Sequence, residues 1–232
     1  MFAPCKLAAS LICADMLDLG TEVERLERGQ ADHIHLDVMD GVFVPRYGLP
    51  PEVLSAVRKR TSIPVDVHLM VADPEPYIDT FVRAGADIVT FHIESTMHAS
   101  RVIGRIRQAG ARAGVALNPA TSPNVLEWIA EDLALVLVMA INPGIVGHRL
   151  IPGMIAKITQ VRDLVNGVNP TCIVEVDGGV TFESAPRMVA AGADMLVCGN
   201  STIFRPDRPV DKALRDLRAS LRSASPRSGG EP

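Results

Sequence analysis

Short apolar segments alternate with longer segments of helical periodicity along nearly the whole chain. In 17–28, for example, Leu19, Val23 and Leu26 recur at the spacing of an amphipathic helix. Segments that alternate in this way predict β-strands connected by α-helices, which is the pattern of a parallel sheet. The expected strands are 6–11, 33–38, 64–69, 88–91, 113–117, 133–140, 171–176 and 195–198, and the expected helices are 17–28, 50–62, 75–84, 99–109, 124–130, 152–165, 183–191 and 210–222.

Eight strand and helix pairs within 232 residues favour closure into a single (β/α)8 TIM barrel, a fold that typically takes roughly 250 residues. We expect residues 1–222 to form this barrel as one catalytic domain. The last segment, 223–232, is rich in Ser, Pro and Gly and lacks an apolar pattern, so we expect a disordered C-terminal tail. The tetrapeptide Ala-Gly-Ala-Asp occurs at 84–87 and 191–194, each time between a predicted helix and the next strand. This repeat indicates a turn that ends a helix at Gly, on the barrel face opposite the chemistry.

The composition narrows the class of protein without identifying it. Lys and Arg are scattered and the formal net charge is −4, so neither nucleic acid nor a membrane is expected as a partner. The four cysteines lie far apart without a Cys-x-x-Cys pair, which argues against a zinc ribbon and a disulfide framework. The N-terminus lacks the pattern of a secretory signal, and no apolar run reaches the ~20 residues of a membrane span. We therefore expect a soluble, cytoplasmic protein.

Polar residues stand at the C-terminal ends of several predicted strands, where the active site of such a barrel lies. His35 and Asp37 share one face of 33–38, His68 ends the next strand, and Asp177 follows 171–176. A single inward His is more often a hydrogen-bonded core residue, and a single Asp before Gly is more often a turn former. Four such groups at one barrel mouth instead predict a site for a divalent metal ion. Mixed nitrogen and oxygen ligands of this kind suit Zn²⁺, Fe²⁺, Mn²⁺ or Co²⁺.

Glycine-containing loops follow the last three predicted strands and are candidates for phosphate binding. Glycine lets backbone N–H groups approach an anion closely, and the loops after strands seven and eight often hold phosphate in such barrels. A Gly-Gly pair alone is weak evidence, because tight turns also need glycine. Three neighbouring loops of this kind together predict a phosphate site. Its candidate residues are Gly144, Gly178, Gly179, Gly199, Asn200 and Ser201.

Six segments form a more specific pattern, in order and with regular spacing between about Lys6 and Phe204. They are Ser10–Asp15 (SLICAD), His35–Gly41 (HLDVMDG), His68–Val71 (HLMV), Leu117–Pro119 (LNP), Asn142–Gly144 (NPG) and Glu175–Gly179 (EVDGG). Together they resemble the signature segments of the ribulose-phosphate 3-epimerase family. The resemblance covers nearly the whole predicted barrel.

The resemblance implies a metal-dependent enzyme that inverts C3 of a ketose phosphate, with the conversion of D-ribulose 5-phosphate to D-xylulose 5-phosphate as the first expectation. It implies that His35, Asp37, His68 and Asp177 bind one divalent ion, and that Asp37 and Asp177 are the acid/base pair. The chemistry agrees, because inversion beside a carbonyl requires proton removal from one face of an enediolate and return to the other. The resemblance also implies a homo-oligomer, either a dimer or a hexamer.

The resemblance adds further residues to the site. It places Ser10, His68 and Gly147 at the substrate, together with the glycine loops. It places Met39, Met70 and Met139 as a soft apolar layer at the enediolate, although ordinary core filling is the alternative interpretation of these methionines. Glu175 shares a strand face with Asp177 and is a candidate for orienting a ligating histidine. The role of His92 stays open.

Two loops depart from the family pattern. After the sixth predicted strand the chain reads Asn142–Arg149 (NPGIVGHR) in place of Asn-Pro-Gly-Phe-Gly-Gly-Gln, in a loop that resembles the lid over the substrate. After the eighth, Gly199–Thr202 is longer by one residue than the common Gly-Ser pattern. Both departures touch substrate contacts, so a related ketose phosphate such as D-allulose 6-phosphate is an alternative substrate.

Two other functions compete with an epimerase. A keto-gulonate phosphate decarboxylase is disfavoured, because its strand-borne Asp-x-Lys-x-x-Asp motif would need a lysine that His35–Asp40 (HLDVMD) lacks. A phosphosugar-binding protein without turnover is the alternative from another class. Such a protein would have a broken ligand or base set, whereas this chain has all four residues.

Overall fold

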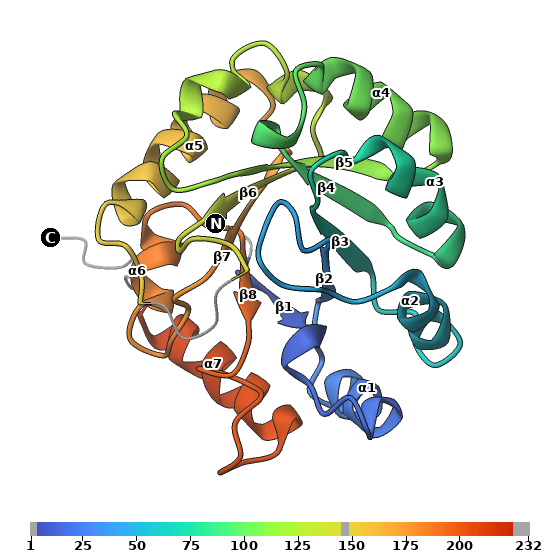
Figure 1. Cartoon of the computed structure of the whole chain (residues 1–232). Helices are drawn as coiled ribbons and strands as arrows, with labels where there is room; N and C mark the ends of the chain where they lie inside the picture. Colours follow the sequence, from blue (N-terminus) through green and yellow to red (C-terminus); the bar gives the residue numbers. More distant parts are fainter. Residues whose placement is uncertain (1–3, 145–148, 225–232) are drawn as a thin grey trace, which may run out of the picture.

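Eight parallel β-strands close into a barrel, and helices cover its outer surface (Figure 1). The computed structural model describes residues 4–144 and 149–224. Each strand hydrogen-bonds to the next one in sequence, and β8 closes the barrel against β1. The predicted (β/α)8 barrel is therefore confirmed. The strands are β1 (Lys6–Ser10), β2 (His33–Met39), β3 (Val65–Met70), β4 (Ile88–His92), β5 (Arg112–Leu117), β6 (Leu135–Met139), β7 (Ile173–Asp177) and β8 (Met195–Cys198).

The helices bury one apolar stripe each against the barrel, as Val23 and Leu26 do in α1. Gly85 and Gly110 end α3 and α4 in the left-handed conformation, with φ of 113° and 101°, which glycine adopts without steric cost. Helix α7 continues to Ala224, into the predicted tail, whose remaining residues 225–232 lie outside the described part. The α-helices are α1 (Leu19–Arg28), α2 (Pro51–Arg58), α3 (Glu75–Ala84), α4 (Ala99–Ala109), α5 (Met154–Val168), α6 (Ala185–Ala190) and α7 (Val210–Ala224).

One predicted helix, 124–130, is wrong. The chain there forms two short 3₁₀ turns, η3 (Pro123–Leu126) and η4 (Ala130–Asp132). Leu126 and Ile129, three residues apart, are buried, and this spacing matches the three residues per turn of a 3₁₀ helix. A segment this short cannot offset the cost of nucleating an α-helix unless it buries a broad apolar face, which this segment lacks.

The two Ala-Gly-Ala-Asp turns stabilise the N-terminal end of the barrel. The Asp87 carboxylate accepts hydrogen bonds from the Val65 N–H and from the Arg58 guanidinium, each at 2.8 Å. The Asp194 carboxylate accepts in the same way from the Val174 N–H at 2.9 Å. Each aspartate satisfies a backbone donor near the start of a neighbouring strand, so both turns have the structural role that the sequence predicted.

The barrel interior contains a band of buried polar side chains, which core strands usually exclude. The strand register places Asp37 of β2 beside His68 of β3, and Met139 of β6 beside Asp177 of β7. Buried charges are costly unless partners compensate for lost hydration. A band of this kind therefore points to function rather than to packing.

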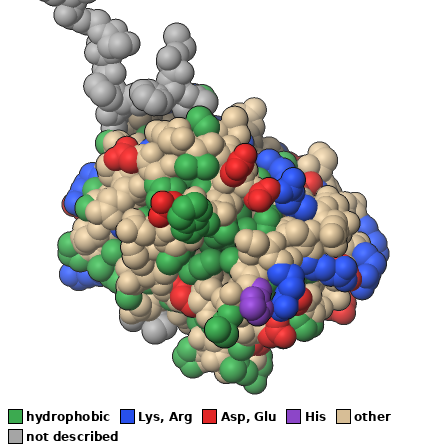
Figure 2. All heavy atoms as spheres, turned by 90° about the horizontal axis from the view of Figure 1, so that it is seen from above, with side chains coloured by type: hydrophobic (Ala, Val, Ile, Leu, Met, Phe, Trp, Pro, Cys, Tyr) green, Lys and Arg blue, Asp and Glu red, His purple; other side chains and the backbone are tan. Residues whose placement is uncertain are grey.

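Charged side chains of both signs are interspersed on the face shown in Figure 2, around a central group of hydrophobic side chains. Charged residues of the molecular surface also form ion pairs, as Arg101 does with Glu75 and Arg205 with Asp207. No helix in the described ranges is long and apolar enough to cross a membrane.

Candidate active site

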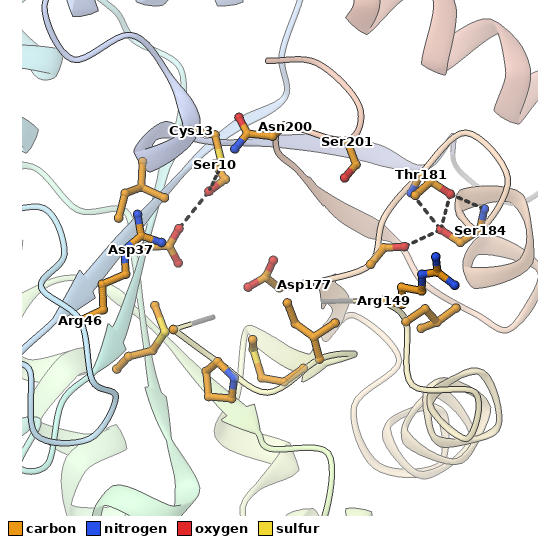
Figure 3. Close-up of a pocket in the computed structure, with 18 of the residues that line it drawn as sticks. Ser10, Cys13, Asp37, Arg46, Arg149, Asp177, Thr181, Ser184, Asn200 and Ser201 are labelled. Atoms are coloured by element: carbon orange, nitrogen blue, oxygen red, sulfur yellow. Dashed lines mark hydrogen bonds between the residues drawn. The ribbon is translucent and has the colours of Figure 1, made fainter. Parts of the chain in front are cut away.

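A cavity of about 710 Å³ opens at the C-terminal ends of the strands. Its floor includes the last residues of several strands, among them Ser10 of β1, Met39 of β2 and Asp177 of β7. Figure 3 shows the carboxyl groups of Asp37 and Asp177 facing the same space from two sides. The volume lies within the ~300–1,000 Å³ typical of sites for small molecules. The cavity is therefore where the sequence predicted the chemistry.

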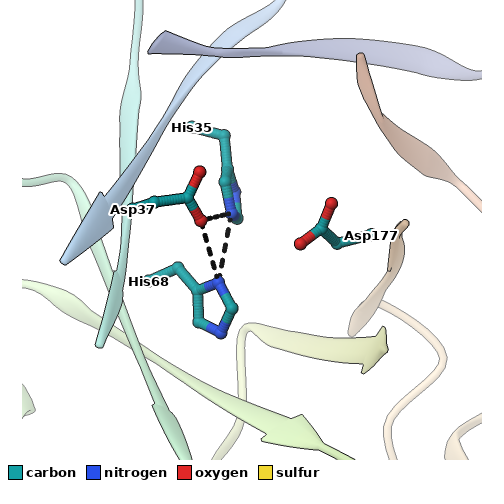
Figure 4. A group of neighbouring side chains, drawn as sticks. All are labelled: His35, Asp37, His68 and Asp177. Carbon is teal, nitrogen blue, oxygen red and sulfur yellow. Dashed lines mark hydrogen bonds and ion pairs between the residues drawn. The ribbon is translucent and has the colours of Figure 1, made fainter. Parts of the chain in front are cut away.

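The four predicted metal-site residues come together at this cavity (Figure 4). His35, Asp37, His68 and Asp177 each offer a ligand atom, and these atoms lie within 4.8 Å of one another. Three of them form an equilateral triangle, because His35 Nε2, His68 Nδ1 and Asp37 Oδ1 are each 3.3 Å from the other two.

This triangle fits a metal ion better than a set of hydrogen bonds. In tetrahedral coordination with bonds of about 2.0–2.1 Å, neighbouring ligand atoms lie about 3.3–3.4 Å apart. An N–H···O hydrogen bond instead prefers about 2.9 Å, and all three contacts are longer. Two histidine nitrogens, one carboxylate oxygen and Asp177 as a fourth ligand make a donor set that Zn²⁺, Fe²⁺, Mn²⁺ and Co²⁺ accept. The residues present therefore fit one divalent ion.

Asp66 orients the first histidine of the triangle. His35 Nδ1 lies 2.9 Å from Asp66 Oδ2, and Thr90 Oγ1 donates to the other oxygen of Asp66 at 2.8 Å. A proton on His35 Nδ1 directs its Nε2 toward Asp37 and the triangle. Sequence reasoning suggested Glu175 for this role, but its carboxyl oxygen is 3.6 Å from His35 Nδ1, which is too far for a hydrogen bond.

His35, Asp66 and Glu175 also form a second group of possible metal ligands, deeper in the barrel. Burial and the neighbouring charge of Asp66 raise the pKa of Glu175 to about 8. Glu175 is therefore mostly protonated at neutral pH, and a protonated carboxyl is a poor ligand. Because Asp66 already accepts from His35 and Thr90, we interpret the pair of His35 and Asp66 as a hydrogen-bonded support of the first group.

His92 and Glu94 orient the second histidine of the triangle. His68 Nε2 lies 2.9 Å from His92 Nε2, and His92 Nδ1 lies 3.2 Å from Glu94 Oε2. Burial would raise the pKa of Glu94, but hydrogen bonds from His92, Thr121 and the Asn118 N–H lower it to about 2. Ionised Glu94 holds the proton of His92 on Nδ1, so His92 Nε2 accepts from His68 Nε2–H. His68 Nδ1 is then left free to bind a metal ion.

The two ligating histidines differ in their affinity for a proton. Burial and the nearby histidines His92 and His35 lower the pKa of His68 to about 4, although Asp37 opposes the shift. Burial also disfavours charge on His35, but ionised Asp37 and the hydrogen bonds to Asp37 and Asp66 raise its pKa well above 6.5. His68 is therefore neutral at neutral pH, whereas His35 is protonated until a metal ion takes its Nε2.

The carboxyl groups of Asp37 and Asp177 also differ in their affinity for a proton. Burial would raise the pKa of Asp37, but the positive charge of His35 and its contact with the carboxylate hold it well below its usual range. Burial and ionised Asp37 raise the pKa of Asp177 to about 7. Paired carboxyl groups whose surroundings separate their pKa values are typical of an acid and a base that work together.

Metal affinity should fall as the pH is lowered. Below neutral pH the proton on His35 Nε2 competes with the ion, and a proton on Asp177 competes in the same direction. We expect the Zn²⁺ dissociation constant to rise by about tenfold or more per pH unit below pH 7, with proton release on binding. Isothermal titration in buffers of different ionisation enthalpy measures both quantities. An affinity that is constant from pH 8 to pH 6 would contradict this account.

Ser10 contacts the site directly. Its hydroxyl donates to Asp37 Oδ2 at 2.9 Å and lines the cavity. His68 on β3 is also predicted to contact the substrate, but it is fully buried and does not line the cavity wall. Its side chain reaches the site only through the triangle with His35 and Asp37.

The three methionines lie on the cavity wall. Met39 and Met70 pack with Val44 into a small apolar cluster at the barrel mouth. Met139 belongs instead to the apolar cluster of the barrel interior, so one face of it fills the core. Met139 therefore lines the cavity, as the predicted apolar layer requires, and also fills part of the core, as the alternative interpretation has it.

The predicted phosphate loops surround one side of the cavity. Gly179 has a φ of 64°, and a Cβ there would lie 2.8 Å from the backbone of Leu150, so only glycine fits between the two loops. Ser184 Oγ donates to the Gly179 carbonyl at 2.7 Å and fixes this turn. Of the remaining candidates Gly144, Asn200 and Ser201 line the cavity, Gly178 and Gly199 are absent from its lining, and Gly147 lies outside the described residues.

Sequence reasoning missed several polar side chains of the cavity wall. Three arginines line it, and Thr181 and Ser184 form the turn beside Gly179. The rule that found the aspartates, a polar residue near a strand end, would also have found Thr181, which follows β7, whereas Arg46 lies further along the loop after β2. The arginines are Arg46 after β2, Arg149 after β6 and Arg187 in α6.

Comparisons with known proteins give consistent matches. The model of the ribulose-phosphate 3 epimerase family matches residues 6–204. The ribulose-phosphate 3-epimerase of Bacillus subtilis is 43% identical over 93% of this chain and 99% of its own length. That of Aquifex aeolicus is 38% identical over 94% of this chain and 97% of its own length. Among solved structures, KGPDC from Streptococcus mutans covers 96% of this chain and 100% of its own, with a TM-score of 0.76, but at 14% identity this similarity shows the fold alone.

Proposed function

Because the chain belongs to the ribulose-phosphate 3-epimerase family and is thus an isomerase, we propose that it epimerises a ketose phosphate at C3 by two-base proton transfer. D-Ribulose 5-phosphate, converted to D-xylulose 5-phosphate, is the substrate we propose first. One divalent ion held by His35, Asp37, His68 and Asp177 completes the proposed site.

The opposed carboxyl groups of Asp37 and Asp177 are the observation that carries the proposal. They come from β2 and β7 and face the same cavity from two sides (Figure 3). Inversion at C3 requires a base on one face of the enediolate and an acid on the other. Burial and ionised Asp37 raise the pKa of Asp177 to about 7, whereas the pKa of Asp37 lies well below its usual range, so the two groups differ as an acid and a base do.

A bound divalent ion would supply positive charge to offset the negative charge that develops on the enediolate oxygens. The chain's own residues prepare the site for this chemistry. Ser10 holds one oxygen of Asp37 by its hydrogen bond. Met39, Met70 and Met139 give the cavity an apolar wall, which strengthens electrostatic interactions inside it. The glycine loops and Ser184 form the side where we place the substrate phosphate.

Solvent exchange at C3 tests the proposal. Purified, metal-loaded protein in deuterium oxide should introduce deuterium at C3 of D-ribulose 5-phosphate and form D-xylulose 5-phosphate, both observable by NMR. D-Allulose 6-phosphate is the second substrate to assay, because the loop 142–149 departs from the family pattern. Binding of either compound without exchange would favour the alternative of a phosphosugar-binding protein. Absence of both binding and exchange would overturn the proposal.

A homo-oligomer, whether a dimer or a hexamer, and a cytoplasmic location stay predictions. Analytical ultracentrifugation of the purified protein measures the first. A monomer at micromolar concentration would contradict it.

A further inference from the structure

Three arginines line the cavity, and they are not spread evenly around it. In Figure 3, Arg149 is on the side of the cavity that carries Thr181 and Ser184 and the proposed phosphate loops, whereas Arg46 is on the opposite side, with Asp37. Arg187 belongs to α6, which directly follows the turn of Thr181 and Ser184, and so adds to the phosphate side. The cavity therefore has cations at two separate places.

Arg46 occupies a fixed backbone position. The loop after β2 folds back on the strand, with the Gly48 N–H donating to the Met39 carbonyl at 3.1 Å and the Leu49 N–H to the Asp37 carbonyl at 2.8 Å. A Cβ at Gly48 would lie 2.4 Å from the Met39 nitrogen, so only glycine permits this close return. The Arg46 N–H itself donates to the Val44 carbonyl at 2.8 Å. The guanidinium thus projects from a preorganised loop, which lowers the entropic cost of ligand binding.

Asp40 ties the same loop to the neighbouring strand. One of its carboxylate oxygens accepts from the Val42 and Phe43 N–H groups at 2.8 and 2.9 Å, and the other accepts from the Ala72 N–H at 2.8 Å. These bonds connect the loop after β2 with the segment after β3. The backbone of the loop that carries Arg46 is therefore held to two neighbouring strands, β2 and β3.

The Arg46 guanidinium has no acidic partner among the described residues, although its side chain is half-buried. Asp37 is drawn on the same side of the cavity in Figure 3, but its Oδ1 faces His35 and His68, and its Oδ2 accepts a hydrogen bond from Ser10. A guanidinium in a cleft that has no ion-pair partner of its own favours an anionic ligand, which it can bind through two parallel hydrogen bonds.

One phosphate does not satisfy all three arginines. A sugar phosphate carries a charge of about −1.5 to −2 at neutral pH, which Arg149 and Arg187 on the phosphate side can balance. The charge of Arg46 remains at the opposite side. We propose that Arg46 is a specificity-determining residue and that the enzyme's preferred substrate is a ketose phosphate with a second anionic group, a carboxylate or a phosphate, at the end remote from the first phosphate.

This inference rests on the proposed epimerase function and, within it, ranks a doubly anionic ketose phosphate above D-ribulose 5-phosphate, which then is a substrate but not the preferred one. The chemistry is unchanged, because the C3–H bond breaks, its proton passes to one carboxylate, and a proton returns to the other face. No oxidant, reductant or co-reactant is needed. The second anion acts only in binding, where a hydrogen-bonded ion pair with Arg46 holds the far end of the carbon chain.

Three unreactive five-carbon ligands test the inference by calorimetry on the metal-loaded protein. They are D-arabinitol 5-phosphate, D-arabinonate 5-phosphate and D-arabinitol 1,5-bisphosphate, which differ at C1 by a hydroxymethyl, a carboxylate or a phosphate group. We expect at least one doubly anionic ligand to bind about 10- to 100-fold more tightly than D-arabinitol 5-phosphate, as a charge-assisted hydrogen-bonded pair allows. The better of the two identifies the second anion.

Variants assign the preference to Arg46. Arg46→Gln should abolish it, and Arg46→Glu should reverse it. Arg83→Gln is the matched control, because it removes the same charge from an exposed position on α3, outside the cavity, and should keep both the preference and epimerisation. Melting curves followed by circular dichroism show whether each variant is folded. Because Arg46 lies in a loop, we expect both of its variants to fold, and one folded variant is enough for the test.

The outcomes separate this inference from the proposed function. If D-arabinitol 5-phosphate binds and D-ribulose 5-phosphate is epimerised, but no doubly anionic ligand is preferred, the inference alone is wrong. A preference that survives in the folded Arg46 variants also overturns it. If none of the three ligands binds and no ketose phosphate is turned over, both the inference and the proposed function are overturned.

Discussion

Replacement of Asp177 by Asn is expected to lower the rate of epimerisation by about 10²- to 10⁴-fold, the usual contribution of a positioned acid or base. The amide keeps the shape of the carboxyl group but cannot take up or deliver a proton at neutral pH. Asp37 is unchanged in this variant, so one face of the substrate still meets a base. The loss should therefore affect inversion more severely than proton removal from that face.

The two faces can be followed separately by deuterium exchange. In Asp177→Asn, the epimer whose C3–H faces Asp37 should exchange with solvent but return to its own configuration. The other epimer, whose C3–H faces position 177, should neither exchange nor invert. Asp37→Asn should give the opposite pattern. NMR of D-ribulose 5-phosphate and D-xylulose 5-phosphate in deuterium oxide measures all four cases.

Metal content must be measured with the exchange, because Asp177 is also a proposed ligand and its loss weakens binding of the ion. The assays are therefore run at saturating metal. Glu183→Gln is a suitable control, since Glu183 lines the same cavity but is exposed and lies outside the group of four. Exchange of both epimers by both aspartate variants would show that a different group transfers the proton.

The location of the site could be predicted because two rules of strand geometry are strict. Side chains alternate between the faces of a strand, so His35 and Asp37 had to share one face. Parallel strands of a barrel end at the same rim, so the strand ends that carry Asp37, His68 and Asp177 had to meet. Both rules use only the local pattern around each residue, and the structure brings these residues together accordingly.

The partners that orient the histidines depend on relations between strands, which one sequence does not display. Asp66 supports His35 because the register sets these two residues directly opposite each other on β2 and β3. A shift of one residue would have placed Val65 or Val67 there instead. Glu175 shared a face with Asp177 as predicted, but its distance from His35 depends on the curvature of the barrel. Parity alone therefore could not separate Asp66 from Glu175.

Loops limited the prediction for a different reason. Arg46 reaches the cavity because the loop after β2 folds back, with an isolated bridge between Asp40 and Tyr47 and the close return at Gly48. These contacts involve residues whose sequence pattern indicates only a turn. The prediction of a helix at 124–130 was also wrong, because the apolar positions of this segment fit a helix but the segment is too short to form one.

Replacement of His92 by Phe is expected to weaken metal binding by about 10- to 100-fold, as loss of the group that supports a ligating histidine usually does. The His92 ring stacks on His68 at 5.0 Å between centroids and lies 4.7 Å from Phe43. Phenylalanine keeps this packing but cannot accept the hydrogen bond from His68 Nε2–H. Without that bond, His68 is free to place its proton on Nδ1, where it blocks the ion.

The same substitution leaves a buried N–H of His68 without an acceptor, so the free energy of unfolding should fall by about 1–3 kcal/mol. Urea unfolding and Zn²⁺ titration measure the two effects separately. Glu94→Gln provides the matched comparison, since its amide oxygen can still accept from His92 Nδ1–H and should leave affinity much closer to that of the unmodified protein. A folded His92→Phe variant that binds Zn²⁺ as tightly as the unmodified protein would show that His68 keeps its orientation without His92.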